Sequence, residues 1–405
     1  MQEHVFILAS HNEAGKNLVA LGQEEEFVLN ESSENALRDF QHWLDKRKDW
    51  SFGFISYDVK NCIEDLESRH PKHSEFPLIH FVRPKIVVEF DVANGEVKIL
   101  KGANHLKGHS SFDDGIRSLF AKGDSTTPSQ KNVLLPRITK QQYIKAVNKL
   151  QQHIHQGDIY EVNYCQEFFS EQKLEHPFAT WQRLNTRTEA PFSSFIQTGN
   201  KYLLSASPER FLKKEGNKII SQPIKGTIKR GKTEQEEIQL KYELLHSEKE
   251  RSENVMIVDL VRNDLSKSAK RGTVKVDELF GVYTFKTVHH LISTVSGELK
   301  DNTTFTQLLK DTFPMGSMTG APKIKAMKLI DEHEYSRRGL YSGSVGYITP
   351  EGDFDFNVVI RSITYNAVKP YISCSVGSAI TALSDPEKEY DECLLKAEAI
   401  IQSLS

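Results

Sequence analysis

The sequence has few cysteines, and the spacing of those it has excludes two kinds of stabilising framework. Cys62, Cys165, Cys374 and Cys393 stand far apart and form no C-x-x-C pair. Neither a disulfide framework nor a zinc site is therefore indicated. None of the four lies in a G-x-C-x-G nucleophile turn, so we expect no glutaminase site in this chain.

Net charge and long apolar runs are also nearly absent. The formal net charge is -3 over 405 residues, which leaves no electrostatic footprint for nucleic acid or an anionic membrane surface. No apolar run is long enough to span a bilayer, and the first ten residues, MQEHVFILAS, lack the basic region of a signal peptide. We expect a cytoplasmic protein that binds neither nucleic acid nor membrane.

The sequence does have a mixture of helix and strand patterns. A polar stretch at residues 123–132 marks a boundary between an N-terminal part, 1–130, and a larger part, 131–405. Thr139 and Gln142 form a capping box for a helix. Strands are predicted at 158–169, 201–207, 217–224, 341–350, 356–365 and 371–380. Strands with helices between and after them predict an α+β fold with large, mostly antiparallel sheets.

Lys225 stands between Ile224 and Gly226 in the stretch SQPIKGTIKRG, residues 221–231. Its amine has three possible roles: a surface charge, an anion clamp or a nucleophile. The basic residues that follow favour a solvated charge on a hairpin, because lysine is almost never buried without a partner.

Two predicted helices begin with similar capping patterns. Ser247 is a good N-cap and Glu250 stands three residues later. Ser384 and Glu387 repeat this spacing before the C-terminal helix. Serine followed by an acidic residue at this distance is a capping box, so the structural role of these glutamates is the simplest interpretation.

Each of these helices also presents two glutamates on one face. Glu250 and Glu253 are three residues apart, as are Glu389 and Glu392. Either pair alone is typical of a solvated acidic face. If the fold brings the helices together, the four carboxylates repel one another unless they are protonated or neutralised by a hard divalent cation, for which Mg²⁺ is suited.

Two further stretches suit an anion. FPMGSMTGAPKIKAM, residues 313–327, places glycines before a helix predicted to start at Pro322, where free N–H groups attract a carboxylate or phosphate. Arg361 lies among apolar residues in FNVVIRSITY, residues 356–365. A buried arginine needs a partner, which is either a structural salt bridge or a substrate carboxylate.

These pieces, in this order, resemble the chorismate-utilising enzymes over roughly the last two thirds of the chain. The N-terminal part matches faintly, through SFGFISYD at 51–58. The resemblance implies a large α/β sandwich of two packed, mostly antiparallel sheets with outer helices. It rests on SASPER (205–210), PIKGT (223–227), ERSENVMIVDLVRNDL (250–265), VHHLIS (288–293), GSMTGAPK (316–323), YSGSVGY (341–347), VVIRS (358–362) and DPEKEYDECLLKAEAI (385–400).

The resemblance gives Lys225 a chemical role. Members that form anthranilate or isochorismate typically have alanine here, whereas those that form aminodeoxychorismate typically have lysine. In the latter the amine is implied to attack C2 of chorismate and expel the C4 hydroxyl, before ammonia adds at C4 and expels the lysine. Desolvation and a bound cation are expected to lower the pKa of this amine. The alternatives are an anthranilate synthase component I and, less favoured, a non-catalytic chorismate- or metal-binding homologue.

Other roles follow from the same resemblance, position by position. Glu209 matches the general acid that protonates the C4 hydroxyl, and His290 lines the ring, whereas His289 is expected to be structural. Mg²⁺ is implied as cofactor, with Glu253 and Glu392 as principal ligands and Glu250 and Glu389 as partners through water. Positions implied to contact substrate are Gly226, Thr227, Thr319, Gly320, Tyr341, Arg361, Gly377 and Lys396.

Two residues depart from the family pattern. Glu161 stands where isochorismate and salicylate synthases have a lysine that activates water, which argues against water as the nucleophile, although glutamine is more usual in ammonia users. Ala379 replaces a frequent glycine, and its methyl group would shift a carboxylate that approaches the backbone. Relatives receive ammonia from a glutamine amidotransferase subunit, and we expect the same partner here.

Overall fold

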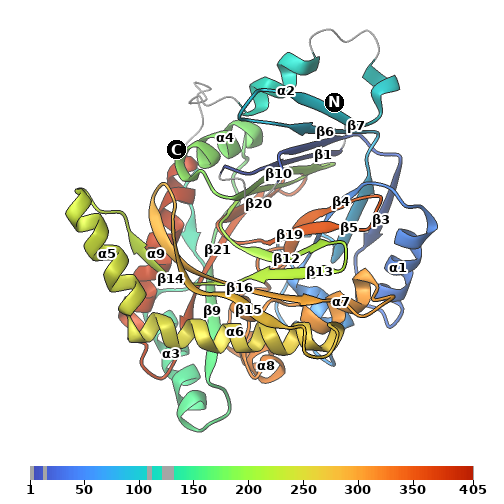
Figure 1. The fold of residues 1–405 in the computed structure, drawn as a ribbon. Helices are drawn as coiled ribbons and strands as arrows, with labels where there is room; N and C mark the ends of the chain where they lie inside the picture. The colour runs from blue at the N-terminus through green and yellow to red at the C-terminus, as the bar shows by residue number, and fades with distance from the viewer. Residues whose placement is uncertain (1–3, 12–15, 107–111, 121–131, 405) are drawn as a thin grey trace.

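Two large β-sheets packed together form the frame of the molecule (Figure 1). The computed structural model describes residues 4–11, 16–106, 112–120 and 132–404. Every strand pairing in these residues is antiparallel, and helices lie on the outer surfaces. The predicted sandwich of two antiparallel sheets is confirmed.

The first sheet, sheet A, has eleven strands among the described residues. These are β1 (His4–Ala9), β2 (Leu18–Leu21), β6 (Ile86–Phe90), β7 (Val97–Lys101), β8 (Leu135–Pro136), β9 (Glu161–Ser170), β10 (Phe192–Thr198), β11 (Lys201–Ser207), β17 (Gly320–Ala321), β20 (Ser362–Asn366) and β21 (Tyr371–Ile380). Their order is β17-β9-β21-β20-β11-β10-β1-β2-β6-β7, with β8 also paired to β9.

The second, sheet B, has ten strands in the same part of the chain. These are β3 (Glu25–Leu29), β4 (Ser51–Ile55), β5 (Ile79–Arg83), β12 (Arg210–Glu215), β13 (Lys218–Gln222), β14 (Ile224–Lys229), β15 (Lys275–Thr284), β16 (Val288–Glu298), β18 (Ser344–Ile348) and β19 (Phe354–Val358). Their order is β14-β16-β13-β12-β19-β18-β4-β5-β3, with β15 also paired to β16. The N-terminal strands enter both sheets, and the boundary predicted at 130/131 lies outside the described residues.

Three apolar layers hold the sheets and helices together. One fills the space between the sheets, and the other two pack the outer face of each sheet against helices. The helices are α1 (Ala36–Lys46), α2 (Phe112–Phe120), α3 (Lys140–His155), α4 (Pro177–Thr188), α5 (Glu234–His246), α6 (Glu248–Ser268), α7 (Phe305–Thr312), α8 (Lys323–His333) and α9 (Pro386–Ser403), with short 3₁₀ turns at Tyr57–Cys62, Ala103–Leu106 and Gly316–Met318. No helix among the described residues is long and apolar enough to cross a membrane.

Local capping signals were predicted correctly at α3 and wrongly at α9. Thr139 and Gln142 form the predicted capping box of α3. At α9 the N-cap is Asp385, whose side chain accepts from the Glu387 backbone N–H, and not Ser384. The physical reason is Pro386, which occupies the first helical position and so makes the residue before it the cap.

The chain passes from one sheet to the other at two adjacent connections. Glu209 lies between β11 of sheet A and β12 of sheet B, and Arg361 lies between β19 of sheet B and β20 of sheet A. The single strand predicted over 356–365 is therefore wrong, because Arg361 has a positive φ of 52° that breaks the extended backbone. The connections are joined by hydrogen bonds from Ala206 N to Arg361 O and from Val358 N to Glu209 O.

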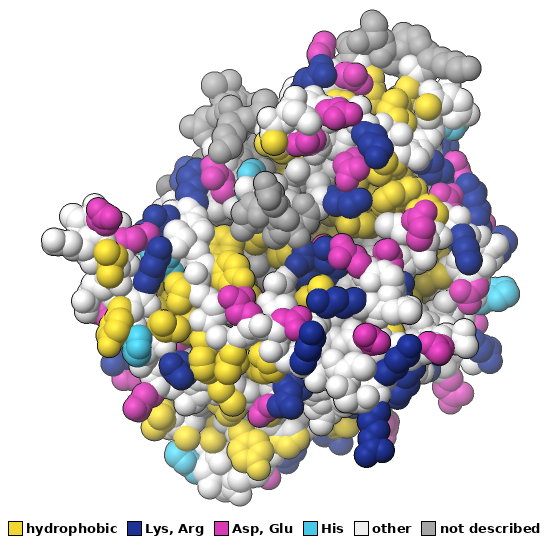
Figure 2. Space-filling model, in the orientation of Figure 1, with side chains coloured by type: hydrophobic (Ala, Val, Ile, Leu, Met, Phe, Trp, Pro, Cys, Tyr) yellow, Lys and Arg dark blue, Asp and Glu magenta, His cyan; other side chains and the backbone are white. Residues whose placement is uncertain are grey.

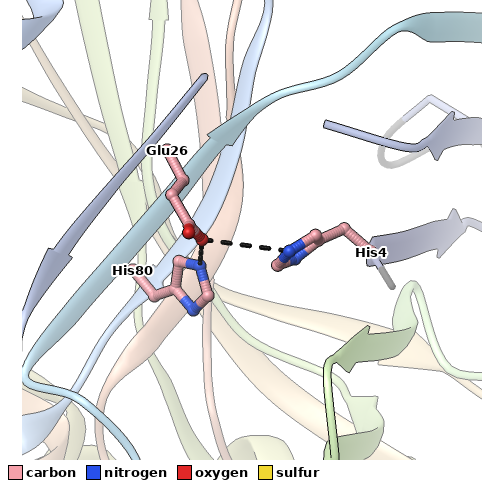
Figure 3. Close-up of side chains that lie close together, drawn as sticks. All are labelled: His4, Glu26 and His80. Atoms are coloured by element: carbon pink, nitrogen blue, oxygen red, sulfur yellow. Dashed lines mark hydrogen bonds and ion pairs between the residues drawn. The ribbon is translucent and has the colours of Figure 1, made fainter. Parts of the chain in front are cut away.

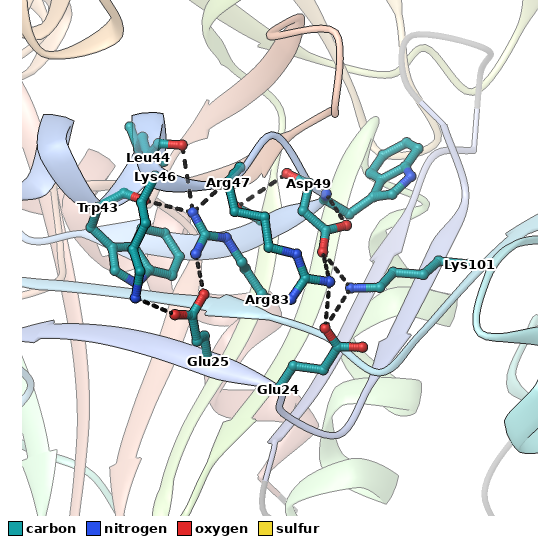
Figure 4. Close-up of polar contacts among 11 residues, drawn as sticks. Glu24, Glu25, Trp43, Leu44, Lys46, Arg47, Asp49, Arg83 and Lys101 are labelled. Atoms are coloured by element: carbon teal, nitrogen blue, oxygen red, sulfur yellow. Dashed lines mark hydrogen bonds and ion pairs between the residues drawn. The ribbon is translucent and has the colours of Figure 1, made fainter.

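Arg83 fastens the N-terminal helix α1 to sheet B (Figure 4). It is fully buried and donates to a Glu25 carboxylate oxygen and to the carbonyls of Trp43, at 2.6 Å, and Arg47, at 2.9 Å. Its guanidinium also lies 4.1 Å from the Trp43 ring centre. Carbonyls at a helix end lack partners inside the helix, so Arg83 supplies their hydrogen bonds.

A second polar cluster joins the two sheets near the N-terminus (Figure 3). His80 Nε2 lies 2.9 Å from Glu26 Oε2 within sheet B, and His4 Nε2 of sheet A lies 3.8 Å from the same oxygen. Burial lowers the pKa of His80, although Glu26 acts in the opposite direction. On the face of the molecule drawn in Figure 2, acidic and basic side chains are interspersed, as the small net charge predicts.

Candidate functional site

A cavity of about 530 Å³ lies where β14, β16 and β21 meet helices α6 and α9 and the two connections between the sheets. This volume is within the range of small-molecule sites. Most residues predicted to form a site line it: Lys225, Glu209, His290, Gly226, Thr227, Tyr341, Arg361, Gly377, Lys396, Glu250, Glu253, Glu389 and Glu392. Residues far apart in the sequence are thus brought to one place.

Lys225 is buried, so its interpretation as a solvated hairpin charge is wrong. The side chain is 8% exposed, lines the cavity, and donates from Nζ to Glu161 Oε1 at 2.5 Å. Burial pulls the pKa of the amine down, as expected, but Glu161 and Glu253 outweigh burial and raise the pKa overall. The expectation that the protein lowers the pKa of Lys225 does not include the carboxylate of Glu161, which acts in the opposite direction.

Glu209 has the properties that a general acid requires. It is 4% exposed and lines the cavity, and burial raises its pKa to about 7 even though Ser317 Oγ donates to its Oε1 at 2.5 Å. A carboxyl group with this pKa is partly protonated near neutral pH and can donate its proton to a leaving group.

Arg361 points to an anionic ligand. Burial lowers the pKa of this guanidinium, and no hydrogen bond or salt bridge joins it to any residue that the structure describes. The structural salt bridge considered for it is therefore not found within the described chain. A half-buried guanidinium beside a cavity suits a carboxylate, which it can bind through two parallel hydrogen bonds. Tyr341 lines the same cavity.

His290 is a neutral residue of the cavity wall. Burial lowers its pKa to about 3, and its Nδ1 lies 2.8 Å from Thr227 Oγ1. It is therefore uncharged near pH 7. His289, the adjacent histidine, is fully buried and contacts Thr284 and Glu237 away from the cavity lining, as expected of a structural residue.

Four glutamates of α6 and α9 line the cavity, but their oxygens are not gathered at one point. Burial raises the pKa of Glu250 and raises that of Glu253 to about 8, whereas Lys396, 2.5 Å from Glu392, more than offsets burial and lowers the pKa of Glu392. Among the described residues, only the N-terminal cluster brings three potential ligand atoms within 4.8 Å of one another. The four carboxylates therefore line the same cavity, as predicted, but they do not crowd at a single point.

This donor set nevertheless suits Mg²⁺ chemically. Glu253 Oε1 is buried and accepts no hydrogen bond from a described residue, and carboxylate oxygens are the ligands that Mg²⁺ prefers. A divalent cation would neutralise the destabilised anions of Glu250 and Glu253. Lys249 interacts with the same group, at 3.1 Å from Glu389 and 3.9 Å from Glu253.

Thr319 and Gly320 lie behind the cavity wall. Neither lines the cavity, whereas Ser317 and Met318 before them do. The Thr319 hydroxyl donates within its own loop, to the Met315 and Gly316 carbonyls, and Gly320 pairs with β9. Their position does not support the predicted substrate contacts. Glycine is required at 320 because a Cβ atom would lie 2.2 Å from the Glu161 carbonyl oxygen.

The sequence does not predict the contacts that two charged residues, Glu161 and Lys249, make at the site. The sequence shows Glu161 as a departure from the family pattern but does not predict its contact with Lys225, because the two are 64 residues apart and belong to different sheets. Lys249 was not singled out, although it stands four residues before Glu253, a spacing that allows an ion pair on a helix. Ala379 lines the cavity, as its neighbour Gly377 does.

Comparisons with known proteins show the family of this chain. The chain matches the chorismate binding enzyme family over residues 3–402. It is 35% identical to anthranilate synthase component 1 of Thermus thermophilus, over 87% of this chain and 76% of that protein. It is 41% identical to aminodeoxychorismate synthase component 1 of Escherichia coli, over 66% of this chain and 58% of that protein.

The fold has a close counterpart among solved structures. Anthranilate synthase component I from Streptococcus pneumoniae aligns with a TM-score of 0.82 at 23% identity, covering 96% of this chain and 92% of that one. This likeness concerns the fold, whereas the family match extends over almost the whole sequence. The chain therefore belongs to the family of chorismate-binding enzymes.

Proposed function

We propose that this protein is an aminodeoxychorismate synthase component I, which converts chorismate and ammonia to 4-amino-4-deoxychorismate for 4-aminobenzoate and folate synthesis. The observation that carries the proposal is Lys225, a buried amine that lines the cavity. Glu209 and Arg361 line the same cavity and supply an acid and an anion-binding group. Together they offer the three functions that the reaction needs.

In the proposed reaction, Lys225 Nζ forms a bond to C2 of chorismate while the two conjugated ring double bonds shift and the C4–O bond breaks. Glu209 donates its proton to the departing hydroxyl, which leaves as water. Ammonia then forms a bond to C4, the double bonds shift back, the bond between C2 and Lys225 breaks, and the new amino group returns a proton to Glu209. Arg361 would hold a substrate carboxylate throughout, and neutral His290 would line the ring without competing for protons.

Mg²⁺ is the proposed cofactor, held by Glu253 and Glu392, with Glu250 and Glu389 as partners through water. When bound, it would neutralise negative charge from the glutamates and from a substrate carboxylate. Excess chelator is expected to abolish activity, and added magnesium to restore it. Full activity in chelator would contradict this assignment.

A glutamine amidotransferase subunit is the proposed source of ammonia. None of Cys62, Cys165, Cys374 and Cys393 has the sequence context of a glutaminase nucleophile, and the relatives named above are called component 1. Free ammonium at alkaline pH is expected to replace the partner. Glutamine alone is expected to support no turnover.

Anthranilate synthase component I is the second candidate. The relative from Thermus thermophilus covers 87% of this chain at 35% identity, and aminodeoxychorismate synthase component 1 of Klebsiella aerogenes covers the same share at 39% identity. Lys225 favours the first candidate, since anthranilate-forming members typically have alanine at this position. The two functions differ in product and in the release of pyruvate.

The test is to incubate the purified protein with chorismate, magnesium and ammonium at pH 8 and to separate the products by chromatography and mass. Lys225→Ala is compared with Lys218→Ala, a control on neighbouring β13 whose side chain is 53% exposed. We expect aminodeoxychorismate without pyruvate from the wild type and the control, and its loss in Lys225→Ala. Anthranilate with pyruvate from all three proteins would favour the second candidate.

A further inference from the structure

We propose that Glu161 is the proton acceptor of Lys225: it takes a proton from the Lys225 ammonium before attack and returns it when the lysine is released. This inference rests on the proposed function, in which Lys225 is the nucleophile. Glutamate at this position is a departure from both family patterns, so the role is specific to chains that carry it.

The placement of the two groups supports a proton transfer. Lys225 lines the cavity, whereas Glu161 is only 1% exposed and does not line it. Glu161 therefore lies behind the amine as seen from the cavity. Its Oε1 accepts from Nζ at 2.5 Å, a distance at which a proton can pass directly between the two atoms.

The backbone of Glu161 is held on both sides of its strand end. It pairs with Ala321 of β17, and the next residue, Val162, pairs with Ile380 of β21. The other carboxylate oxygen, Oε2, is buried and has no hydrogen-bond partner among the described residues. Glu161 can thus gain a proton on Oε1 without losing another interaction.

Other charged groups that face Lys225 come from different elements. Glu253 of α6 and Glu209 between β11 and β12 both act on the amine through their charge. Glu209 accepts a hydrogen bond from Ser317, and neither carboxylate accepts one from Lys225 within the described chain. Glu161 is therefore the acceptor in place for the proton.

A comparison with glutamine, the usual residue at this position in ammonia-using relatives, shows what a carboxylate changes. An amide cannot take the proton and carries no charge, so a lysine beside it depends on desolvation and loses its proton to water. A carboxylate stabilises the charged form of the lysine, but it is also a proton acceptor in direct contact with the amine. The same nucleophile can thus be prepared in two ways, and this chain uses the internal transfer.

Protons and electron pairs balance between Lys225, Glu161 and the ring. The N–H bond of the ammonium breaks as an O–H bond forms on Glu161, and the freed electron pair of Nζ attacks C2. When the C2–N bond breaks, the lysine leaves as a neutral amine and takes the proton back from Glu161. Glu161 keeps this proton while the lysine is bound to the ring. The proton for the departing C4 hydroxyl comes from Glu209.

The experiment compares wild type with Glu161→Gln over pH 6.5–9.5, with saturating chorismate, magnesium and free ammonia. Groups common to both proteins, Glu209 among them, cancel in the ratio of their kcat values. We expect this ratio, variant to wild type, to rise about tenfold per pH unit below the pKa of the variant lysine, since only the variant must lose its proton to water. The KM for chorismate is expected to stay nearly constant.

Two further variants separate chemistry from structure. Glu161→Asp keeps a carboxylate and is expected to give a ratio independent of pH, even if kcat falls. Glu167→Gln changes another buried glutamate of β9, which contacts Tyr371 and Ser373 outside the cavity lining, and is also expected to give a flat ratio. A flat ratio for Glu161→Gln would overturn the role of Glu161.

A direct readout does not depend on turnover. The rate of Lys225 labelling by acetic anhydride, followed by peptide mass spectrometry, is expected to rise about tenfold per pH unit in Glu161→Gln below the pKa of its lysine and to stay nearly constant in wild type. The same pH dependence in both proteins would overturn the inference while leaving the proposed function intact. Wild type that forms anthranilate instead of aminodeoxychorismate would overturn both.

Discussion

Arg83 in the N-terminal part is fully buried and Arg361 at the cavity is half-buried, and the partners of the two guanidinium groups differ. Arg83 donates to Glu25 and to carbonyls at the end of α1. The guanidinium of Arg361 has no hydrogen bond or salt bridge to any described residue, and Arg361 lines the cavity. The difference teaches that a charged group that is hydrogen-bonded within the chain stabilises the fold. A charged group that lines a cavity without such partners is available to bind a ligand.

The largest expected effect is on the cavity side of this comparison. Glu209→Gln should lower kcat for chorismate amination by about 10²–10⁴-fold, because an amide cannot protonate the leaving hydroxyl. The raised pKa of Glu209, about 7, predicts that wild-type activity declines as pH rises above about 7, since the acid is then ionised. Steady-state kinetics measure both effects, and an unchanged kcat in the variant would reject the assigned role.

On the structural side, Arg83→Met should lower the free energy of unfolding by about 3 kcal/mol, because it removes the donor to the carbonyls of Trp43 and Arg47 and one of the two cations paired with Glu25. The catalytic constants of the protein that remains folded should not change. Urea unfolding and kinetics on the same preparation provide the measurement. A stable variant with altered KM would erase the distinction between the two arginines.

Arg361→Lys keeps the charge but loses the planar pair of donors. We expect KM for chorismate to rise by about ten- to a hundredfold, corresponding to one lost charge-assisted hydrogen bond of about 1.5–3 kcal/mol. Stability should change little, because the guanidinium has no partner among the described residues. Strong destabilisation with an unchanged KM would place Arg361 in the same class as Arg83.

The smallest effect concerns the N-terminal histidine cluster. The pKa of His80 is lowered by burial, so the folded state holds His80 neutral below the pH at which the unfolded chain takes up a proton. Stability should therefore fall as pH drops below about 6.5. His80→Gln should weaken this dependence, which urea midpoints at pH 7.5 and 5.5 measure. An identical slope in the variant would assign it to other groups.

Much of this organisation could be predicted from the sequence, where short-range rules decide. The capping box of α3 depends on two residues three positions apart, and it formed as expected. The glutamate pairs of α6 and α9 share faces because helical spacing requires it. Even at this range a neighbour can override the rule, since Pro386 moved the N-cap of α9 from Ser384 to Asp385.

The rest depends on contacts that no local pattern encodes. The pairing of Lys225 with Glu161 requires the edges of two sheets to meet. The bend at Arg361 interrupts a stretch whose composition is that of a continuous strand, and only the passage from sheet B to sheet A requires it. Carboxylates from distant segments, Glu161 and Glu253, also set the direction of the pKa of Lys225 against the effect of burial, which the sequence alone could not give.

The adjacent connections that carry Glu209 and Arg361 are tied to each other by backbone hydrogen bonds between the chain segments on either side. A shift of one sheet across the other would displace the acid and the guanidinium together, in proportion to the slip. Mutations that repack the interior of the sandwich, far from any substrate atom, should therefore alter turnover through the alignment of the two layers. In this architecture, the position of this pair relative to Lys225 is a reporter of how the core is packed.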